Sequence, residues 1–469
     1  MQWVRATDDT FCIAVLGDFL GEAFGAPGTE GMTWIPQRAT PDSVLNLVGL
    51  RPRIQASLHL GGAGETLEFT SLQSFDPGEF FQKMEMYKPL REAREAAKLG
   101  RQEEVAHPEE RPLETPGTEE AGGANLLDAI LDVTQPSREA PPPGTPEEIE
   151  AFVREVVRPH LVRDDSDAKT RIAAVDQAAS LRVSDLLHTE AFQRLEALWR
   201  SLVFLLSRVD TTRKVRVYLV HLPREELERD LSPEADPRRS RLFDLLGSPE
   251  LGAPGRRWAV AAGAYRFGSD ADEVGLLARI AGIAQAADVP WISAIDPTPS
   301  AGDEGPGSSL ERWISDPGDA WQSFRRSPEA AWMGLTHPRF LLREPYGEAT
   351  RRVRGFGFEE KVESWDHLLW GDGPFLPVAL LAQGFASDGW GFPTERHLDL
   401  GGMPLGNIPG GVGVSPTSME VSLSPGEARR LMEEGIMPLV GFSERAGIRV
   451  GGIHPLSGPG RRLEGWWRR

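Results

Sequence analysis

The stretch WQSFRRSPEAAWMGLTHPRFLLREPYG, residues 321–347, decides what kind of fold this chain builds. Aromatic residues, arginines and prolines alternate in it at short range. Pro338 and Pro345 each restrict the backbone of the residue before them. The stretch is therefore predicted to be a rigid path with several breaks rather than one long helix. It contains no nucleophile–base pair and no phosphate-binding loop.

Two sets of side chains in this stretch make different demands on their surroundings. Aromatic rings anchor a core, and guanidinium groups need carboxylates or backbone carbonyls as partners. The aromatic set is Trp321, Phe324, Trp332, Phe340 and Tyr346, and the arginines are Arg325, Arg339 and Arg343. We expect carboxylates such as Glu344, Glu359 or Glu360 to hold the arginines inside a core. The alternative is an anion-binding site.

Length and composition set the broad class of the protein. A chain of 469 residues is expected to hold two or three domains, and an apolar fraction of 40% supports a packed core. No run reaches the roughly 18 apolar residues of a membrane-spanning helix. The start, MQWVRATDDTF, has no basic region followed by an apolar stretch, so no secretory signal is visible. The expected location is the cytoplasm, without membrane insertion.

Charge and cysteine content exclude several kinds of partner. A formal net charge of −19 argues against nucleic acid, which usually binds proteins with a basic excess. A single cysteine rules out an internal disulfide framework and a thiolate metal cluster. Cys12 lies in the apolar run FCIAVLGDF and is expected to be inert and buried.

Residues 1–100 have the pattern of a small α/β unit. The apolar run at residues 11–16 predicts a buried strand that ends in a turn. Alternating residues at 54–60 and 66–72 predict a hairpin, and residues 77–99 are helical in character. A unit of about this size can fold alone.

Residues 101–147 differ in composition and predict a flexible linker. Glu, Pro and Gly dominate them, and such sequences cannot bury enough apolar surface to order themselves. One apolar island, residues 125–134, predicts a short helix with a single apolar stripe. That stripe consists of Leu126, Leu127, Ile130 and Leu131. The helix either docks on its own domain or is exposed for recognition by a partner.

From residue 148 onward the pattern predicts a larger mixed-sheet α/β domain, which makes the fold class α/β (α+β). A capping box at residues 145–148 precedes a helix, Thr189 starts a second helix, and residues 215–220 form a strand. The order strand, helix, strand over residues 258–295 is a βαβ unit, with Ser269 or Asp270 capping the helix.

The last part of the chain is predicted to continue in the same style. We expect an apolar helix over residues 375–385, a capped helix over 424–435, and a strand at MPLVGF, residues 437–442. Trp466 and Trp467 lie between the last glycine and two terminal arginines. They either anchor the terminus by packing or form an exposed peptide that seeks a partner.

Motifs that carry chemistry are missing from the sequence. It has no G-x-S-x-G elbow, Walker A loop or HExxH helix, and its nine histidines are scattered. GGAG at 61–64 and GGVG at 410–413 are expected to be turns. Asp366 and His367 are adjacent, so their side chains point apart and form no triad. We therefore expect no catalytic, cofactor-binding or metal-binding residue, and no enzyme.

Several long segments resemble the large sheath subunit of bacterial type VI secretion systems, called TssC or VipB. They are WQSFR, GLTHPRFLLREPYG, EAFQRLEALWRSLVFLLSRVD and GAYRFGSDADEVGLLARIAGIAQAADVPWISAI. The resemblance marks these family-signature structural residues: Trp199, Trp321, Phe324, Arg325, Pro338, Arg339, Phe340, Arg343, Pro345 and Tyr346.

Residues 1–100 resemble the small sheath subunit, TssB or VipA, through FCIAVLGDFLG, LEFTSLQSFDPGEFFQKM and PLREAREAAK. Small and large subunits are normally separate chains, so the resemblance implies a fusion through residues 101–147. The large-subunit-like domain is expected at residues 148–469, without the C-terminal domain with which the family's large subunit normally continues.

The resemblance also implies a function and partners. Sheath subunits assemble around an inner tube of Hcp-like protein, attach to a baseplate and contract to drive the tube outward. The ClpV unfoldase recycles contracted sheaths, and Leu126–Leu131 resemble the LLDxIL helix that it recognises in some systems. One hypothesis is a sheath protomer. The other is a non-polymerising accessory that binds sheath, baseplate or the unfoldase.

Overall fold

The structure, a computed structural model, describes residues 10–22, 33–56, 65–99, 167–212, 214–247, 257–297, 306–406, 416–442 and 446–468. The predicted linker, its helix at residues 125–134, the capping box at 145–148 and both glycine clusters lie outside these residues. No helix within the described part is long and apolar enough to cross a membrane.

The chain divides into two compact units. The first comprises Met1–Ala56, Thr66–Lys83 and Ser180–Arg469, and the second Ser57–Glu65 and Met84–Ala179. The division falls inside helix α6, Asp167–Leu187. The units differ from the segments predicted from composition, because segments far apart in the sequence build the first unit together.

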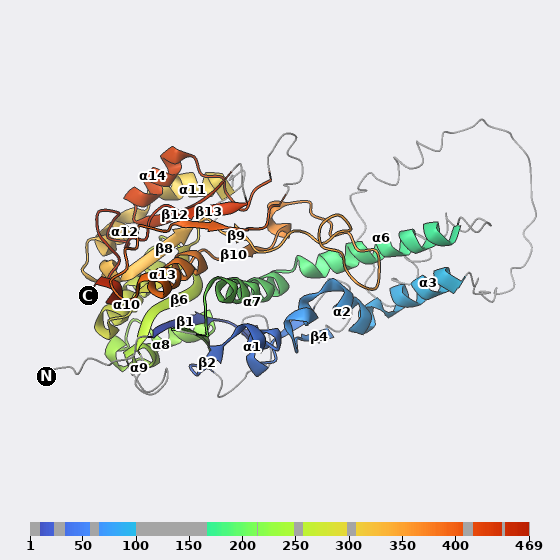
Figure 1. Cartoon of the computed structure of the whole chain (residues 1–469), viewed down its shortest axis with the longest axis horizontal. Helices are drawn as coiled ribbons and strands as arrows, with labels where there is room; N and C mark the ends of the chain where they lie inside the picture. Colours follow the sequence, from blue (N-terminus) through green and yellow to red (C-terminus); the bar gives the residue numbers. More distant parts are fainter. Residues whose placement is uncertain are drawn as a thin grey trace, which may run out of the picture. The chain divides into compact units, whose positions relative to one another are not determined.

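A mixed sheet forms the centre of the first unit (Figure 1). Its strand order is β11-β13-β12-β8-β7-β6-β1-β5-β2. The six strands from β12 to β5 run parallel, and β2, β13 and β11 pair antiparallel with their neighbours. The strands are β1 Phe11–Gly17, β2 Pro36–Ala39, β5 Val215–His221, β6 Trp258–Phe267, β7 Trp291–Ile295, β8 Met333–His337, β11 Asp399–Gly401, β12 Ile436–Gly441 and β13 Gly447–Val450. The predicted mixed-sheet α/β class is confirmed.

Strand β1 lies inside this sheet, between β5 and β6. It pairs parallel with both, and all seven of its residues are buried. A strand covered on both faces needs a continuous apolar run, which FCIAVL supplies. Residues 1–100 therefore share a sheet with the later segment instead of building one alone. The predicted segment boundaries at residues 100 and 148 stay a prediction.

The predicted βαβ unit is present as β6, helix α10 (Ala271–Ala287) and β7. The two strands are parallel, and the side chain of Asp270 accepts hydrogen bonds from the N–H groups of Asp272 and Glu273. Asp270, rather than Ser269, is thus the N-cap. Asp288 ends the helix in the left-handed region, at φ 62°.

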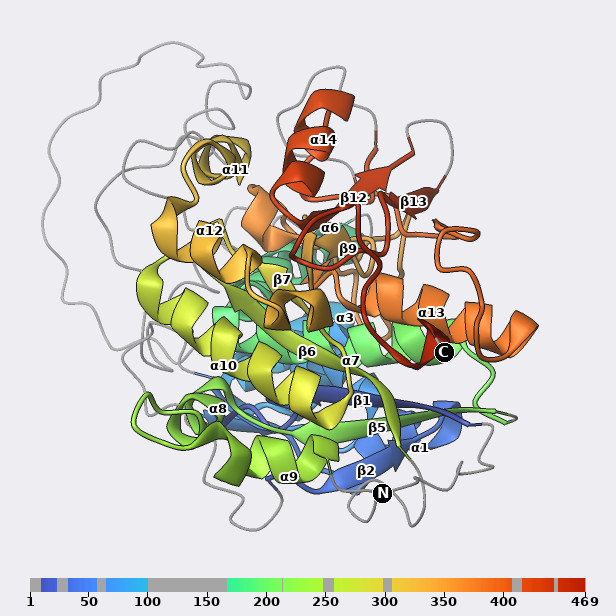
Figure 2. The same cartoon turned by 90° about the vertical axis from the view of Figure 1, so that its left-hand side faces the viewer.

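Helices cover both faces of the sheet. In Figure 2, α10 and α12 (Gly318–Arg325) lie on one side, and α7 (Glu190–Arg208) and α13 (Phe375–Asp388) on the other. The alternation along β1 fits this arrangement. Cys12, Ala14 and Leu16 join the core on the α10 side, whereas the ring of Phe11 lies 5.2 Å from that of Phe385 in α13. Cys12 is buried, as predicted.

Shorter elements complete the described part. The strands β3 (Arg53–Ala56) and β4 (Glu65–Glu68) pair as predicted, but β4 ends before residue 72 because a 3₁₀ turn occupies Leu72–Phe75.

The other helices are α1 Pro41–Leu45, α2 Pro77–Lys83, α3 Lys88–Leu99, α8 Arg224–Asp230, α9 Arg241–Gly247, α11 Pro306–Ser315 and α14 Pro425–Glu433. The 3₁₀ helices include η4 Glu85–Tyr87, η6 Pro237–Arg239, η7 Glu329–Trp332, η8 Trp365–His367 and η9 Trp466–Arg468, and the short strands β9 Phe340–Leu341 and β10 Trp370–Gly371 form a pair.

The second unit contains α3 and the first part of α6. Arg94 of α3 holds Asp176 of α6 through two hydrogen bonds, Nε to Oδ1 at 2.5 Å and one terminal nitrogen to Oδ2 at 3.2 Å. Asp176 is 7% exposed, so the pair is largely shielded from water. This contact fixes the two helices against each other.

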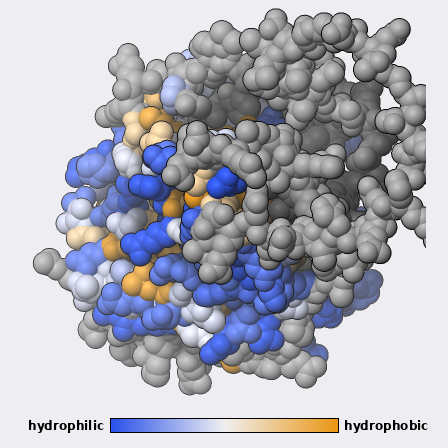
Figure 3. All heavy atoms as spheres, turned by 90° about the vertical axis from the view of Figure 1, so that its right-hand side faces the viewer, coloured by the Kyte–Doolittle hydropathy of each residue, from blue (hydrophilic) through white to orange (hydrophobic). Residues whose placement is uncertain are grey.

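Figure 3 shows that the described residues on one face of the molecule are mostly hydrophilic, with small separate hydrophobic areas. Within the described part, the large hydrophobic side chains that are exposed are Ile35, Leu45 and Trp390.

Candidate functional site: a buried arginine network

Residues 321–347 follow the broken path that the sequence predicts. The chain passes through α12, η7, β8 and β9, with Pro338 between the two strands. The aromatic side chains of this segment are mostly buried. Trp321, Phe324, Phe340 and Tyr346 are each at most 6% exposed, while Trp332 is partly buried. The expectation that they anchor a core is consistent with this burial.

Arg343 lies at the centre of a buried network. Its Nε is 3.2 Å from Oε1 of Glu196, and one terminal nitrogen is 2.7 Å from Oε2 of Glu360. Its guanidinium carbon is also 4.4 Å from the centre of the Tyr346 ring. Glu196 belongs to α7, so Arg343 connects that helix with the loop that carries Glu360.

Arg200 extends the network along α7. Its Nε donates to Oε1 of Glu196 at 2.6 Å, and a terminal nitrogen donates to the hydroxyl of Tyr346 at 3.1 Å. Glu196 is fully buried and accepts from two guanidinium groups. A buried carboxylate requires such compensation, because burial without a partner costs several kcal/mol.

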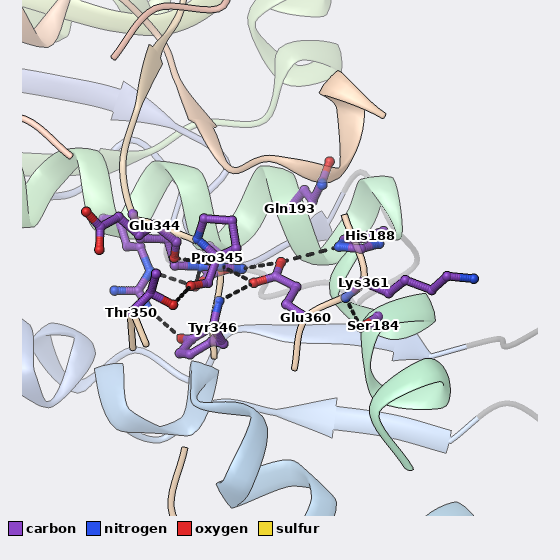
Figure 4. Close-up of polar contacts among 12 residues, drawn as sticks. Ser184, His188, Gln193, Glu344, Pro345, Tyr346, Thr350, Glu360 and Lys361 are labelled. Atoms are coloured by element: carbon purple, nitrogen blue, oxygen red, sulfur yellow. Dashed lines mark hydrogen bonds and ion pairs between the residues drawn. The ribbon is translucent and has the colours of Figure 1, made fainter. Parts of the chain in front are cut away.

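Glu360 is the second carboxylate that Arg343 contacts. Figure 4 shows it between Tyr346 and His188. The backbone N–H of Tyr346 donates to its Oε2 at 2.8 Å, and His188 Nε2 lies 3.3 Å from its Oε1. Burial opposes ionisation of this carboxyl, but the charge of Arg343 and the hydrogen bonds from His188, Arg343 and Tyr346 outweigh it. Together they lower the pKa of Glu360 to about 2. The same loop is tied to α6, since Ser184 Oγ accepts from the N–H of Lys361 at 3.0 Å.

The other two arginines of the signature stretch also hold carboxylates. Arg339 forms a two-pronged pair with Glu420, at 2.9 and 2.5 Å. Burial lowers and Glu420 raises the pKa of Arg339, and the net shift is upward. Arg325 lies 2.8 Å from Glu434 and donates to the carbonyl of Leu456 at 3.2 Å. All three guanidinium groups are thus engaged in carboxylate pairs, which favours the bracing interpretation over an anion site.

Of the three carboxylates named as possible partners, one pairs with an arginine of the stretch. Glu360 pairs with Arg343, as expected. Glu344 offers Arg343 only its backbone carbonyl, at 3.4 Å, and the carboxylate of Glu359 accepts from the N–H of Glu348. The remaining partners, Glu196, Glu420 and Glu434, were missed because they are distant in sequence. The sequence contains one indication for Glu196. It is a charged residue among the buried apolar residues of α7, next to Leu195.

The signature residue Trp199 joins α7 to the N-terminal segment. Its indole N–H donates to the carbonyl of Phe19 at 3.1 Å, and the two rings meet edge to face at 5.2 Å. Pro345 contributes its carbonyl, which accepts from the hydroxyl of Thr350 at 2.7 Å.

His367 also packs inside this unit. Its ring stacks on that of His188 at 4.0 Å, and its Nδ1 accepts from the N–H of Glu363 at 3.1 Å. Burial, and then the neighbouring His188, lower its pKa. His367 is thus a packed side chain that contacts His188.

The two alternatives for the C-terminal tryptophans are resolved in favour of packing. Trp467 is 4% exposed, its ring stacks 6.4 Å from that of Phe11, and its indole N–H donates to the carbonyl of Leu463. The guanidinium of Arg257 lies 5.1 Å from the centre of the Trp466 ring. The candidate recognition helix with Leu126, Leu127, Ile130 and Leu131 lies outside the described residues.

Residues 169–448 match the VipB family, described as EvpB/VC_A0108, tail sheath N-terminal domain. The chain belongs to this tail sheath family. The matched region includes every pair of the arginine network described above.

One curated relative of this tail sheath chain is the type VI secretion system sheath protein TssC1 of Pseudomonas aeruginosa. The two are 30% identical over 292 residues, which is 57% of this chain and 57% of the relative. The chain thus spans little more than half the length of that relative. A solved structure, the 6-fold symmetrised cryo-EM structure of the anti-feeding prophage (AFP) baseplate, matches with 12% identity and a TM-score of 0.27, covering 57% of this chain and 54% of that one.

Proposed function

We propose that this chain is a structural component of a type VI secretion contractile sheath, in the cytoplasm. In this role it assembles with other sheath subunits around an Hcp-like inner tube, attaches to a baseplate and contracts to propel the tube. The family match over residues 169–448 is the observation that carries the proposal. The proposal assigns no catalytic residue, because a sheath stores its energy in the packing between subunits.

The arginine network supports this proposal physically. A subunit that transmits force needs an interior that does not deform, and paired charges in a dry core have few alternative arrangements. Removing one partner of a buried pair leaves an uncompensated charge and costs about 3–5 kcal/mol. Arg343, Glu196 and Glu360 thus hold α7 and the loop at residues 343–360 in one relative position.

The proposal includes the fusion. A small-subunit-like segment, residues 1–100, is joined through residues 101–147 to a large-subunit-like segment, residues 148–469. The position of β1 between β5 and β6 supports it, because two subunits that share a sheet are suited to joining in one chain. Fusion fixes their ratio at one to one and raises their effective concentration for each other.

Negative-stain electron microscopy of the purified protein tests the function. Long hollow tubules, formed alone or with TssB- and TssC-like partners, are the expected result. Persistent monomers in the presence of those partners would overturn the protomer role. They would favour the alternative, a non-polymerising adaptor that binds sheath, baseplate or unfoldase. The alternative is retained because the family match identifies a tail sheath N-terminal domain, which an adaptor could also carry.

A second part of the proposal concerns recycling. The apolar stripe of Leu126, Leu127, Ile130 and Leu131 is proposed as the helix that a ClpV-type AAA+ unfoldase recognises, on the strength of its sequence alone. Replacing Leu127 and Ile130 by Asp should abolish pull-down of the unfoldase. Replacing Asp128 and Asp132 by Asn is the matched control, since it alters the same segment and keeps the stripe. Equal pull-down by both variants contradicts the proposal.

A further inference from the structure

A polar hollow lies in the first unit, between α2 with its preceding turn and the loop at residues 352–355. Its volume is about 480 Å³. Gln73, Asp76 and Gln82 line one wall, and Arg352 and Arg354 line the other. The arginine network does not include any of these residues.

Glycines set the spacing of the two walls. A side chain at Gly78 would place its Cβ 2.3 Å from the carbonyl oxygen of Arg354. Gly355 adopts φ +102°, a backbone conformation that favours glycine. The backbones of the two segments are therefore in direct contact next to the hollow. This contact fixes the distance between its walls.

The arginines of this hollow differ from those of the network. Within the described part of the chain, the side chains of Arg352 and Arg354 have no carboxylate, hydrogen-bond or aromatic partner, and both residues are exposed. Arg343, Arg339 and Arg325, by contrast, are all paired.

The carboxylates of the hollow do not cancel this positive charge. Glu79 lies 2.8 Å from Lys83 in the next turn of α2 and accepts from the amide of Gln73 at 3.1 Å. Asp76 accepts from the backbone N–H of Gly78 at 2.9 Å. Because Lys83 offsets Glu79, two guanidinium groups face one uncompensated carboxylate. The hollow is a local positive site in a chain with a formal net charge of −19.

We propose that this hollow binds a carboxylate-rich peptide segment. Arg352 and Arg354 pair with its glutamates, as guanidinium groups pair with carboxylates in general, and the amide of Gln82 binds its backbone. The chain carries such a segment at residues 102–120, QEEVAHPEERPLETPGTEE, with seven glutamates and one arginine. The proposed occupant is this segment of a second copy of the chain, and occupation by the chain's own segment is the other outcome of the test. The inference does not depend on the sheath function.

The binding test uses a fluorescein-labelled peptide of residues 102–120. It is titrated by fluorescence anisotropy into the full chain in which the seven glutamates of the native segment are replaced by Gln, so that the tethered copy does not compete. We expect saturable binding at about 0.05 M salt, where charge pairs are weakly screened. R352E/R354E should weaken the binding at least about tenfold, which corresponds to 1.4 kcal/mol.

Two controls make the result specific. R238E/R239E reverses the charge of two exposed arginines in η6, outside the hollow, and should leave the affinity unchanged. A peptide with all glutamates replaced by Gln should not bind. Absence of binding to the first chain, or equal binding by R352E/R354E, overturns the proposal. Circular dichroism verifies that each variant is folded.

The unaltered chain distinguishes the two sources. If the segment binds within its own chain, the labelled peptide binds more weakly to the unaltered chain than to the glutamine-substituted chain at every protein concentration. The reason is that tethering gives the native segment an effective concentration in the millimolar range. If it comes from a second copy, this competition grows with protein concentration. Tubule formation, read separately by electron microscopy, distinguishes failure of this inference from failure of the proposed sheath function.

Discussion

At the scale of single residues, the arginine network concentrates charge where water is absent. Arg343 meets two carboxylates and an aromatic ring, and the pKa of Arg343 is raised well above its ordinary value because Glu196 and Glu360 outweigh burial. Such a group stabilises the fold only while all its partners are present. Replacing any one charged residue of the network by an uncharged residue should therefore destabilise the fold.

Glu360→Gln tests this sensitivity. The amide leaves Arg343 with half of its compensating charge, so the free energy of unfolding should fall by about 3–5 kcal/mol. Chemical denaturation followed by tryptophan fluorescence measures the change. Arg449→Met removes an exposed pair with Asp399 and serves as the control, since exposed ion pairs contribute little. Equal effects of the two substitutions would contradict the bracing role.

The buried side chains of His337 and Glu360 should make the free energy of unfolding depend on pH. Burial lowers the pKa of His337 from its ordinary value of 6.5 to about 4. Between pH 6.5 and 4, His337 binds a proton in the unfolded chain but stays neutral in the folded chain. Acidification through this range therefore destabilises the fold, by up to about 3 kcal/mol. His337→Gln should flatten the stability curve in this window. An unchanged slope in the variant would exclude His337 as its origin.

Glu360 acts in a lower window. Its folded pKa of about 2 lies below the ordinary 4.5, so its stabilisation is complete above pH 4.5 and is lost as the pH falls through 2. Glu360→Gln should remove this acid-dependent part while leaving the slope between pH 6.5 and 4 intact. The two variants thus separate the two windows in one set of denaturation curves.

At the scale of elements, sequence patterns predicted local structure well and tertiary neighbours poorly. The apolar run at residues 11–16 predicted β1, and the strand, helix, strand pattern of residues 258–295 predicted the βαβ unit. Both succeeded because the burial of a strand or helix determines which of its consecutive residues are apolar. The neighbours of β1 begin at Val215 and Trp258, some two hundred residues away, and pairing at that separation leaves no local pattern. Glu420 was missed as the partner of Arg339 for the same reason.

The second unit offers a prediction for a pair of elements. Arg94 and Asp176 join α3 to α6 by two charge-assisted hydrogen bonds, each worth about 1.5–3 kcal/mol. Asp176→Asn weakens both, so amide hydrogen exchange in residues 88–99 should accelerate at least about tenfold. Lys98→Gln, which removes an exposed pair with Glu95 on the same helix, should leave exchange unchanged. Faster exchange in both variants would assign it to the helix itself.

At the scale of the whole molecule, the position of β1 links the two halves of the chain. Removing it from the sheet would leave β5 and β6 without their shared neighbour and expose apolar side chains on both faces. The shared sheet therefore predicts that residues 148–469 fold only when the first segment is supplied. Covalent connection through residues 101–147 supplies it in every copy.

Expression of residues 1–147 and 148–469 as two chains tests this dependence. Co-expressed, they should co-purify as a one-to-one complex with the circular dichroism of the intact protein, because β1 restores the backbone pairing of β5 and β6. Residues 148–469 expressed alone should aggregate, since the edges of β5 and β6 and the apolar side chains that pack on β1, such as Phe385, are exposed. A stable, monomeric fragment 148–469 with cooperative unfolding would contradict the prediction. Co-expression with a first segment carrying Val15→Asp is the control, because a charge on the buried strand should prevent the rescue without shortening the chain.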